Sequence, residues 1–366
     1  MNALPPGYAR AVPIGAGAFG EVWRAREVAT GRWVALKRVG GPERQRSEAA
    51  VLALGLRALP QLHGAVSHRG AHWIAMEYVH GVSLRDAMGL GFSRAESAQL
   101  AAWLVLALAE LHQAGRAHGD LKPENVLVDA RGGVRLVDLE FSGAPGARQG
   151  GTAGYCAPEA GSPAADPRRA DLWSLGVIVH ELLCGARPGA EDRSGTWPRL
   201  RGTAPDWVGL VDALVRIDAS RRPSSAVEAR EDLPGAEPSG DLGPLVREAA
   251  DQKLAGLLSA HAERLVRRSR GAEAMPLLQE ALDLDPDQTQ ALEILPRVRV
   301  AAPNRSWILV AATAVACAAA VVAWRWRDPP PRTPMVGGTG AVRERILVPR
   351  DRSAGETLPL RQRNAR

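Results

Sequence analysis

The sequence predicts an α+β protein whose two lobes meet at a cleft, and two observations lead to this fold class. Residues 8–39 alternate in short strand-like runs around glycine, such as VWRARE and RWVALKRV. After Ser93 the chain becomes mainly helical, with a long amphipathic stretch through Leu111 and a nearly continuous apolar stretch over residues 172–183. A sheet followed by a group of helices implies two lobes packed side by side.

Length and composition limit the possible classes of protein. The chain has 366 residues, of which 46% are hydrophobic and 23% are charged, so a disordered or fibrous protein is excluded. The net charge of +6 arises entirely from residues 325–366, which hold ten Arg and four acidic side chains. The main domain is therefore electrically balanced, and we expect no nucleic-acid partner. The three cysteines lack paired spacing, so neither a disulfide framework nor a zinc site is expected.

Two further elements are predicted between the first strands and the helical region. Residues 72–79, HWIAMEYV, have the composition of a buried strand. The apolar spacing over residues 48–62 predicts a helix, with one face formed by Val51, Leu52, Leu56 and Leu59.

A glycine-rich segment, GAGAFGEV at residues 15–22, fits the pattern G-x-G-x-x-G-x-V. Where side chains are missing, backbone N–H groups can approach a polyphosphate. The pattern alone is weak, because glycine-rich hairpins occur in many folds. A dinucleotide site is disfavoured, since the strand RWVALKRV follows where that motif requires a helix.

The strand after the glycine-rich segment carries Lys37, whose ammonium could reach the α and β phosphates of a nucleotide. An acidic partner on the following helix would hold this lysine in place. Glu48 is the favoured partner, because it precedes Leu52 by one helical turn on the core-facing stripe. Glu43 is the lesser candidate.

The segment HGDLKPENVL, residues 118–127, is more specific. Asp120 and Asn125 stand five residues apart with Lys122 between them, and an apolar strand and then Asp138 follow. At this point the sequence resembles the eukaryotic-like Ser/Thr protein kinases of bacteria, over residues 8–232. The resemblance continues in order through GTAGYCAPE at 151–159, DLWSLGV at 171–177 and the Arg222-Pro223 pair.

The resemblance implies a two-lobed protein kinase fold that uses ATP with Mg²⁺, or Mn²⁺ in its place. Phosphoryl transfer has a loose transition state, so the protein mainly positions the attacking oxygen and neutralises charge. By resemblance, Asp120 accepts the proton of the substrate hydroxyl and Lys122 steadies the γ-phosphate. Asn125 and Asp138 would hold the two metal ions through hard oxygen ligands. The expected substrates are Ser and Thr hydroxyls of proteins.

The resemblance also implies which residues surround ATP. Met76 resembles the gatekeeper at the back of the adenine site, although core packing explains a buried Met equally well. The backbone of residues 77–79 would contact adenine. The ATP-binding set is Gly15, Ala16, Gly17, Ala18, Phe19, Gly20, Val22, Ala35, Lys37, Glu48, Met76, Glu77 and Val79.

Two motifs depart from the family pattern. The usual His-Arg-Asp is His118-Gly119-Asp120 here, and His118 is expected to orient the catalytic loop. The metal-binding Asp-Phe-Gly becomes Asp138-Leu139-Glu140, which replaces a flexible glycine with a carboxylate beside the metal site. A catalytically dead scaffold is therefore one alternative. A small-molecule phosphotransferase is another, but Glu159 of Ala-Pro-Glu together with Arg222 resembles the peptide-substrate lobe of protein kinases.

Beyond the kinase-like region, residues 233–244 are rich in Pro, Gly and acidic residues and predict a linker. Residues 245–298 predict two or three helices and contain one unit that resembles a tetratricopeptide repeat. Such repeats usually need three or more units for stability. The segment is therefore either a module that binds a protein partner or a helical spacer that packs on its neighbours.

The sequence also predicts one transmembrane helix. Residues 307–324 form an uncharged run that would be about 27 Å long as a helix. Eight of these 18 residues are alanine, so a buried soluble helix is the alternative. Tryptophan at both ends and flanking Arg305 and Arg325 favour the membrane span. No signal peptide is visible, so we expect the inner (cytoplasmic) membrane of a bacterium, a cytoplasmic kinase domain and a disordered Arg/Pro-rich tail outside, residues 325–366.

Overall fold

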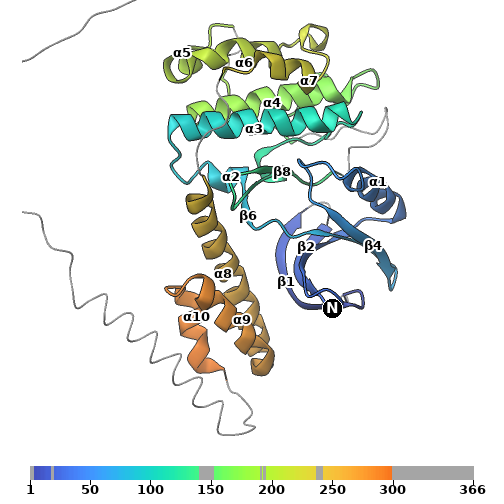
Figure 1. Cartoon of the computed structure of the whole chain (residues 1–366), viewed down its shortest axis with the longest axis vertical. Coiled ribbons are helices and arrows are strands. Elements are labelled where there is room, and N and C mark those ends of the chain that lie inside the picture. Colours follow the sequence, from blue (N-terminus) through green and yellow to red (C-terminus); the bar gives the residue numbers. More distant parts are fainter. Residues whose placement is uncertain are drawn as a thin grey trace, which may run out of the picture. The chain divides into compact units, whose positions relative to one another are not determined.

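The protein is described here from a computed structural model (Figure 1). Residues 1–303 form one compact unit. The residues that the structure describes are 4–17, 20–139, 152–189, 192, 195–235 and 242–298.

The first lobe is built on a five-stranded antiparallel sheet with the order β1-β2-β3-β5-β4. β3 lies at its centre and is buried along most of its length, as its apolar sequence WVALKRV requires. The strands are β1 (Tyr8–Gly17), β2 (Gly20–Glu27), β3 (Trp33–Val39), β4 (Leu62–His68) and β5 (Ala71–Glu77).

Helix α1 (Pro42–Leu52) packs against this sheet, and it differs from the helix predicted over residues 48–62. It begins earlier because Pro42 occupies its first turn, where a missing N–H costs nothing. It ends at Leu52, and three residues later Gly55 adopts a left-handed φ of 65°. Leu59 is buried without being helical, and residues 62–68 form β4, an element that the sequence analysis missed.

The second lobe joins a small sheet to a group of helices. The strands β6 (Gly81–Ser83), β7 (Val126–Asp129) and β8 (Val134–Leu136) pair in that order. A capping box of Ser93 and Glu96 starts the long helix α3. The helices are α2 (Leu84–Ala87), α3 (Arg94–Gln113), α4 (Pro167–Cys184), α5 (Pro198–Thr203), α6 (Val208–Leu214) and α7 (Ala226–Ala229).

The core of the second lobe lies along α3 and α4, which run side by side in Figure 1. Leu104 and Leu108 of α3 and Leu175 of α4 are fully buried, and each such side chain contributes about 1.5–3 kcal/mol to folding. Gly176 allows the close approach of α4 to α6, since a Cβ there would lie 2.6 Å from Val215 Cγ1. The two lobes thus form rigid supports for the loops between them.

A helical segment follows the second lobe and consists of α8 (Gly243–Arg267), α9 (Gly271–Leu284) and α10 (Thr289–Ile294). Its first helix begins at Gly243, so the last residues of the predicted linker 233–244 are already helical. Pro244 in the first turn of α8 explains this start, as proline is pre-organised there.

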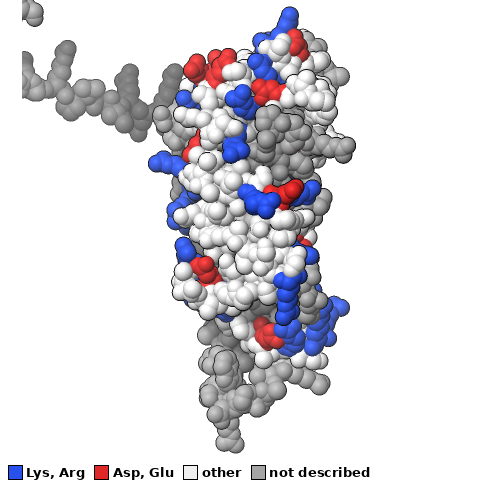
Figure 2. Space-filling view, turned by 90° about the vertical axis from the view of Figure 1, so that its right-hand side faces the viewer, with Lys and Arg blue, Asp and Glu red and all other residues white. Residues whose placement is uncertain are grey.

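Within the described part of the chain, no helix is both long enough and apolar enough to span a membrane. The predicted membrane helix at 307–324 and the tail at 325–366 lie outside the described residues. On the face shown in Figure 2, Lys and Arg side chains are interspersed with Asp and Glu around a large uncharged area.

Candidate active site

The first part of the site joins β3, α1 and the segment after β8. Lys37 Nζ lies 2.8 Å from both carboxylate oxygens of Glu48 and 2.7 Å from Asp138 Oδ1. Of the two acidic candidates, Glu48 is thus the one that contacts Lys37, whereas Glu43 is exposed in the first turn of α1. Burial alone would lower the pKa of Lys37, but the Glu48 and Asp138 carboxylates raise it above its usual value. Lys37 is therefore a fixed cation at this position.

Asp138 has an unusual backbone conformation. Its φ is 66°, in the left-handed region, which for a residue other than glycine costs about 1–3 kcal/mol and is found mainly at functional sites. Leu139, next to it, is fully buried. Glu140, the departure from the family pattern, lies outside the described residues.

The second part of the site is the loop before β7. Lys122 Nζ donates to Asp120 Oδ2 at 2.6 Å and to Thr152 Oγ1 at 2.9 Å. Thr152 Oγ1 in turn donates to Asp120 Oδ1 at 3.2 Å. Asn125 Nδ2 donates to the backbone oxygen of Asp120 at 2.9 Å, so its amide oxygen is its remaining polar atom. The loop therefore presents one oriented carboxylate beside an ammonium.

Asp171, in the first turns of α4, binds the backbone of this loop. Its carboxylate accepts from the backbone N–H of His118 at 2.6 Å and of Gly119 at 2.9 Å, and it contacts His112 Nε2 at 3.1 Å. The sequence analysis named the DLWSLGV motif but not these contacts. The signal that could have found this role is an Asp directly before the apolar stretch at 172–183, since a carboxylate buried there needs several donors.

His118 connects the loop to the segment that leads into Asp138. Its Nδ1 accepts from the backbone N–H of Asp120 at 3.3 Å, so the ring proton lies on Nε2, which faces the carbonyl oxygen of Val137 at 3.1 Å. Burial lowers the pKa of His118 below its usual value, against the opposing effect of the nearby carboxylates. The ring is neutral and orients both parts of the site.

The glycine-rich hairpin joins β1 to β2, with Gly17 paired to Gly20. Only glycine fits at position 20, because a Cβ there would lie 2.0 Å from the backbone oxygen of Arg38 and φ is 148°. Gly15 and Ala16 are exposed on this hairpin, while Val22 is half-buried. Ala18 and Phe19 lie outside the described residues.

The predicted adenine-binding residues lie together on β3, on β5 and just after β5. Ala35 pairs with Met76 across the two strands, and both are buried in the main core. Glu77 ends β5, and its side chain accepts from the backbone N–H of Gln61. Its own backbone N–H donates to the carbonyl oxygen of Gln61 at 2.8 Å, so of its backbone groups the carbonyl oxygen is the possible contact with a base. Val79 is half-buried in the connection to the second lobe.

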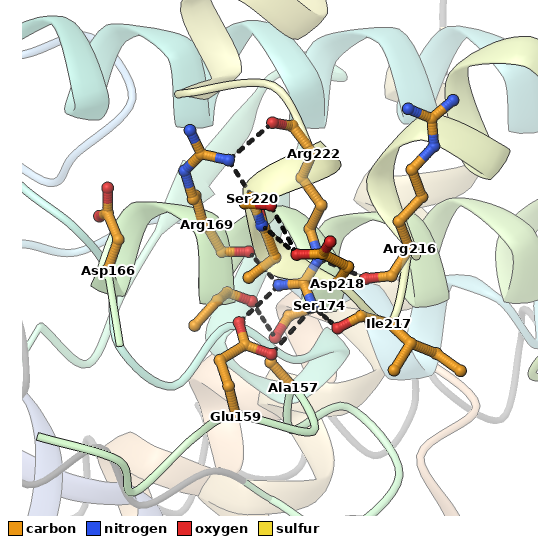
Figure 3. Close-up of polar contacts among 12 residues, drawn as sticks. Ala157, Glu159, Asp166, Arg169, Ser174, Arg216, Ile217, Asp218, Ser220 and Arg222 are labelled. Carbon is orange, nitrogen blue, oxygen red and sulfur yellow. Dashed lines mark hydrogen bonds and ion pairs between the residues drawn. The ribbon is translucent and has the colours of Figure 1, made fainter. Parts of the chain in front are cut away.

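An ion pair between fully buried Arg222 and partly exposed Glu159 fixes the chain between the site and α4 (Figure 3). Arg222 donates to both oxygens of Glu159, at 2.6 and 2.9 Å, in a bidentate arrangement. It also donates to the backbone oxygen of Arg169, while the Arg169 side chain donates back to the carbonyl oxygens of Ala219 and Arg222. This network ties residues 152–159 to the helical lobe.

Arg85 of α2 belongs to a second network, which sequence reasoning missed. Its guanidinium donates to Glu124 and Glu181, both at 2.9 Å, and contacts the Tyr155 hydroxyl. Tyr155 donates to Glu181 at 2.5 Å, and burial together with Glu181 raises the pKa of Tyr155 to about 12. No motif joins these residues in sequence, so only the fold brings them together.

The donor set suits a hard divalent cation that is bound together with a nucleotide. Asn125 and Asp138 offer an amide and a carboxylate oxygen, the ligand types that Mg²⁺ accepts. Among the described residues, no group of three or more His, Cys, Asp or Glu side chains could hold a metal by itself.

A two-lobed protein with a fixed lysine, an oriented aspartate and a glycine hairpin has the parts of a phosphotransferase. Residues 8–232 match the family described as "Protein kinase domain". The chain is therefore a member of the protein kinase family.

Plant and bacterial kinases are both similar to this chain. "Putative CBL-interacting protein kinase 27" of Oryza sativa subsp. japonica is 37% identical over 49% of this chain and 49% of its own length. "Probable serine/threonine-protein kinase pknA2" of Bifidobacterium longum is 30% identical over 60% of this chain and 34% of its own length. "Serine/threonine-protein kinase pkn2" of Myxococcus xanthus is 32% identical over 61% and 32%, respectively. The chain thus spans half or less of the length of these relatives.

Proposed function

We propose that this chain is an ATP-dependent Ser/Thr protein kinase of the eukaryotic-like bacterial type. One observation carries the proposal, namely the hydrogen-bonded group of Asp120, Lys122 and Thr152, at which an acceptor hydroxyl would meet the γ-phosphate. Relatives that are named serine/threonine-protein kinases support it. Bound ATP and Mg²⁺ supply the phosphoryl group and neutralise its charge.

Each residue of the chain has a distinct part in this proposal. Asp120 orients the substrate hydroxyl and accepts its proton, while Lys122, already beside that carboxylate, neutralises charge on the transferred group. Lys37, held by Glu48, binds the α and β phosphates. Asn125 and Asp138 are the metal-binding residues. The backbone N–H groups of the hairpin at 15–20 cover the phosphates, and residues 76–79 bind adenine.

The geometry favours this function over both alternatives. A dead scaffold would follow if Glu140 displaced Asp138, but Asp138 lies 2.7 Å from Lys37, and this contact supports its proposed place beside the nucleotide. A small-molecule phosphotransferase has no need of the buried Glu159–Arg222 pair, which supports the part of the lobe that a protein substrate would contact.

We also propose that residues 307–324 anchor the kinase in the bacterial cytoplasmic membrane, with the tail on the outer side. The kinase domain must lie in the cytoplasm because ATP is found there. A reporter that works only outside the cytoplasm, fused after Arg366, should be active. A fusion that is active only in the cytoplasm would contradict this topology.

The activity is tested by incubating the full chain with labelled ATP, Mg²⁺ and a general protein substrate. Wild type should transfer label to Ser and Thr, and Asp120→Asn should lose nearly all transfer while keeping its melting temperature within a few degrees. The exposed Asp206→Asn serves as the matched control and should retain full activity. Equal label in wild type and Asp120→Asn would support the scaffold alternative instead.

A further inference from the structure

The helical segment packs against both lobes of the kinase. Val246 and Ala250, in the first half of α8, belong to the same core as the helices of the second lobe. Leu254 and Leu258, further along the helix, share a core with Val12 of β1 in the first lobe. A single helix of 25 residues therefore bridges the two lobes.

Polar contacts follow the same route along α8. Lys253 Nζ lies 2.7 Å from Asp86 Oδ2 of α2, in the second lobe. Asp251 Oδ1 lies 2.9 Å from His80 Nε2, in the short connection between the lobes. The segment thus contacts the hinge itself as well as the two lobes on either side.

The contact with the first lobe centres on Arg24 of β2. Its guanidinium lies 3.4 Å from the ring centre of Trp33 and 5.3 Å from that of Tyr78, and its Nη2 lies 2.7 Å from Glu280 Oε1 of α9. The Arg24 side chain is only 6% exposed. Its Nε and Nη1 atoms have no hydrogen-bond partner among the described residues, so Glu280 is the carboxylate that compensates this buried charge.

Arg24 lies beside the adenine-binding residues of the proposed function. In the sheet it pairs with Ala35, which pairs in turn with Met76. The ring that Arg24 faces belongs to Tyr78, which stands between Glu77 and Val79 in the segment proposed to contact adenine through its backbone. Burial raises the pKa of the Tyr78 hydroxyl, and the charges of Arg24, Glu280 and Asp251 also act on it, which places all three near the hinge.

We propose that Glu280 is a positioning residue for ATP, and that through Arg24 the helical segment holds the hinge and the adenine side of the cleft in the shape that binds nucleotide. This inference rests on the proposed kinase function. Without the Glu280 charge, the buried Arg24 guanidinium is uncompensated, which favours its movement away from the Trp33 and Tyr78 rings into solvent. The hinge then loses its support, while the catalytic group around Asp120, in the other lobe, is untouched.

The test compares Glu280→Gln with Glu273→Gln in the full chain. Both changes remove one negative charge from α9. Glu273, seven residues before Glu280, instead forms an exposed ion pair with Arg270. Glu280→Gln should raise the KM for ATP about fivefold or more, in the range usual for coupled sites. The kcat and the KM for the protein substrate should change less than about twofold, and Glu273→Gln should match wild type.

Binding measurements separate this inference from the proposed function. A fluorescent ATP analogue should bind the Glu280→Gln chain more weakly by the same factor, whether or not label is transferred. Because coupling is reciprocal, ATP should slow hydrogen exchange in α9 of wild type and not of Glu280→Gln. Glu280→Asp keeps the charge and should restore at least part of the affinity. Unchanged ATP affinity in Glu280→Gln with a lowered melting temperature would show a structural role only and would overturn the inference.

Discussion

Replacing Lys37 with Met removes the cation that joins Glu48 of α1 to Asp138 of the proposed metal-binding segment. The Lys37 side chain is 8% exposed, Glu48 is 2% exposed and Asp138 is 23% exposed. Methionine has a similar volume and no charge, so the change removes the electrostatic contact without leaving a large cavity. Transfer of phosphate should fall to background, because no other lysine lies on β3 to bind the α and β phosphates.

The same contacts set the size of the effect on stability. Removing one partner of a buried ion pair costs about 3–5 kcal/mol, and the partial exposure of Asp138 places the expected value near the lower end. For a domain of this size 1 kcal/mol shifts the melting temperature by about 2–4 °C, so Lys37→Met should lower it by roughly 6–12 °C.

The assay is thermal unfolding of both chains, with Lys253→Met as the control. Lys253 pairs with Asp86 on the surface, where an ion pair contributes about 0–1 kcal/mol, so the control should shift by less than about 4 °C. The pKa of Lys37 is raised, so its contribution is complete below the unfolded value of 10.5 and is lost as the pH rises through the higher folded value. A Lys37→Met chain as stable as wild type at pH 7 would refute this account of the site.

Three further predictions concern other parts of the fold. Because the pKa of His118 is lowered in the folded chain, stability should decline as the pH falls below 6.5, and a melting temperature that stays flat down to pH 5.5 would contradict this. Glu159→Gln should cost about 3 kcal/mol, since Arg222 stays fully buried, and a change under about 0.5 kcal/mol in chemical unfolding would refute it. Gly119 has no side chain that could bind a phosphate on the segment after Asp138. Ser142→Ala and phosphatase treatment should therefore both leave the activity near that of wild type. A tenfold loss of activity that autophosphorylation restores would show that another basic residue binds the phosphate.

Sequence reasoning found the parts of the site that lie within short motifs. Lys37 and Glu48 were paired from helical spacing alone, and the structure joins them directly. Asp120, Lys122 and Asn125 sit within six residues, where one tight loop fixes their relative positions whatever surrounds it. Motifs of this kind are predictable because local geometry decides them.

The remainder depended on tertiary packing that no local pattern records. The helix was predicted over residues 48–62, whereas the observed helix ends at Leu52. The prediction ran too far because Leu59 continues the apolar spacing, although it is buried without being helical. Strand β4 was missed because LHGAVSH is half-buried and contains glycine, so its alternation is weak. The contacts of Arg24 with Glu280 and of Arg85 with Glu181 join distant parts of the chain.

The anchoring of the catalytic loop bears on how such an enzyme is controlled. In this chain Asp171 binds the two backbone N–H groups before Asp120, and His118 binds the backbone on both sides of the site. The side chains of Asp171 and His118 thus hold the backbone of this loop in place, and on the proposed function we expect the loop to be ordered without an arginine at position 119 and without a phosphate. The first lobe contacts α8 through the apolar cluster that contains Val12, and it contacts α9 through the Arg24–Glu280 ion pair. On the inference above, a partner that drew Glu280 away from Arg24 would act on the ATP side of the cleft and leave the contacts of the catalytic loop intact.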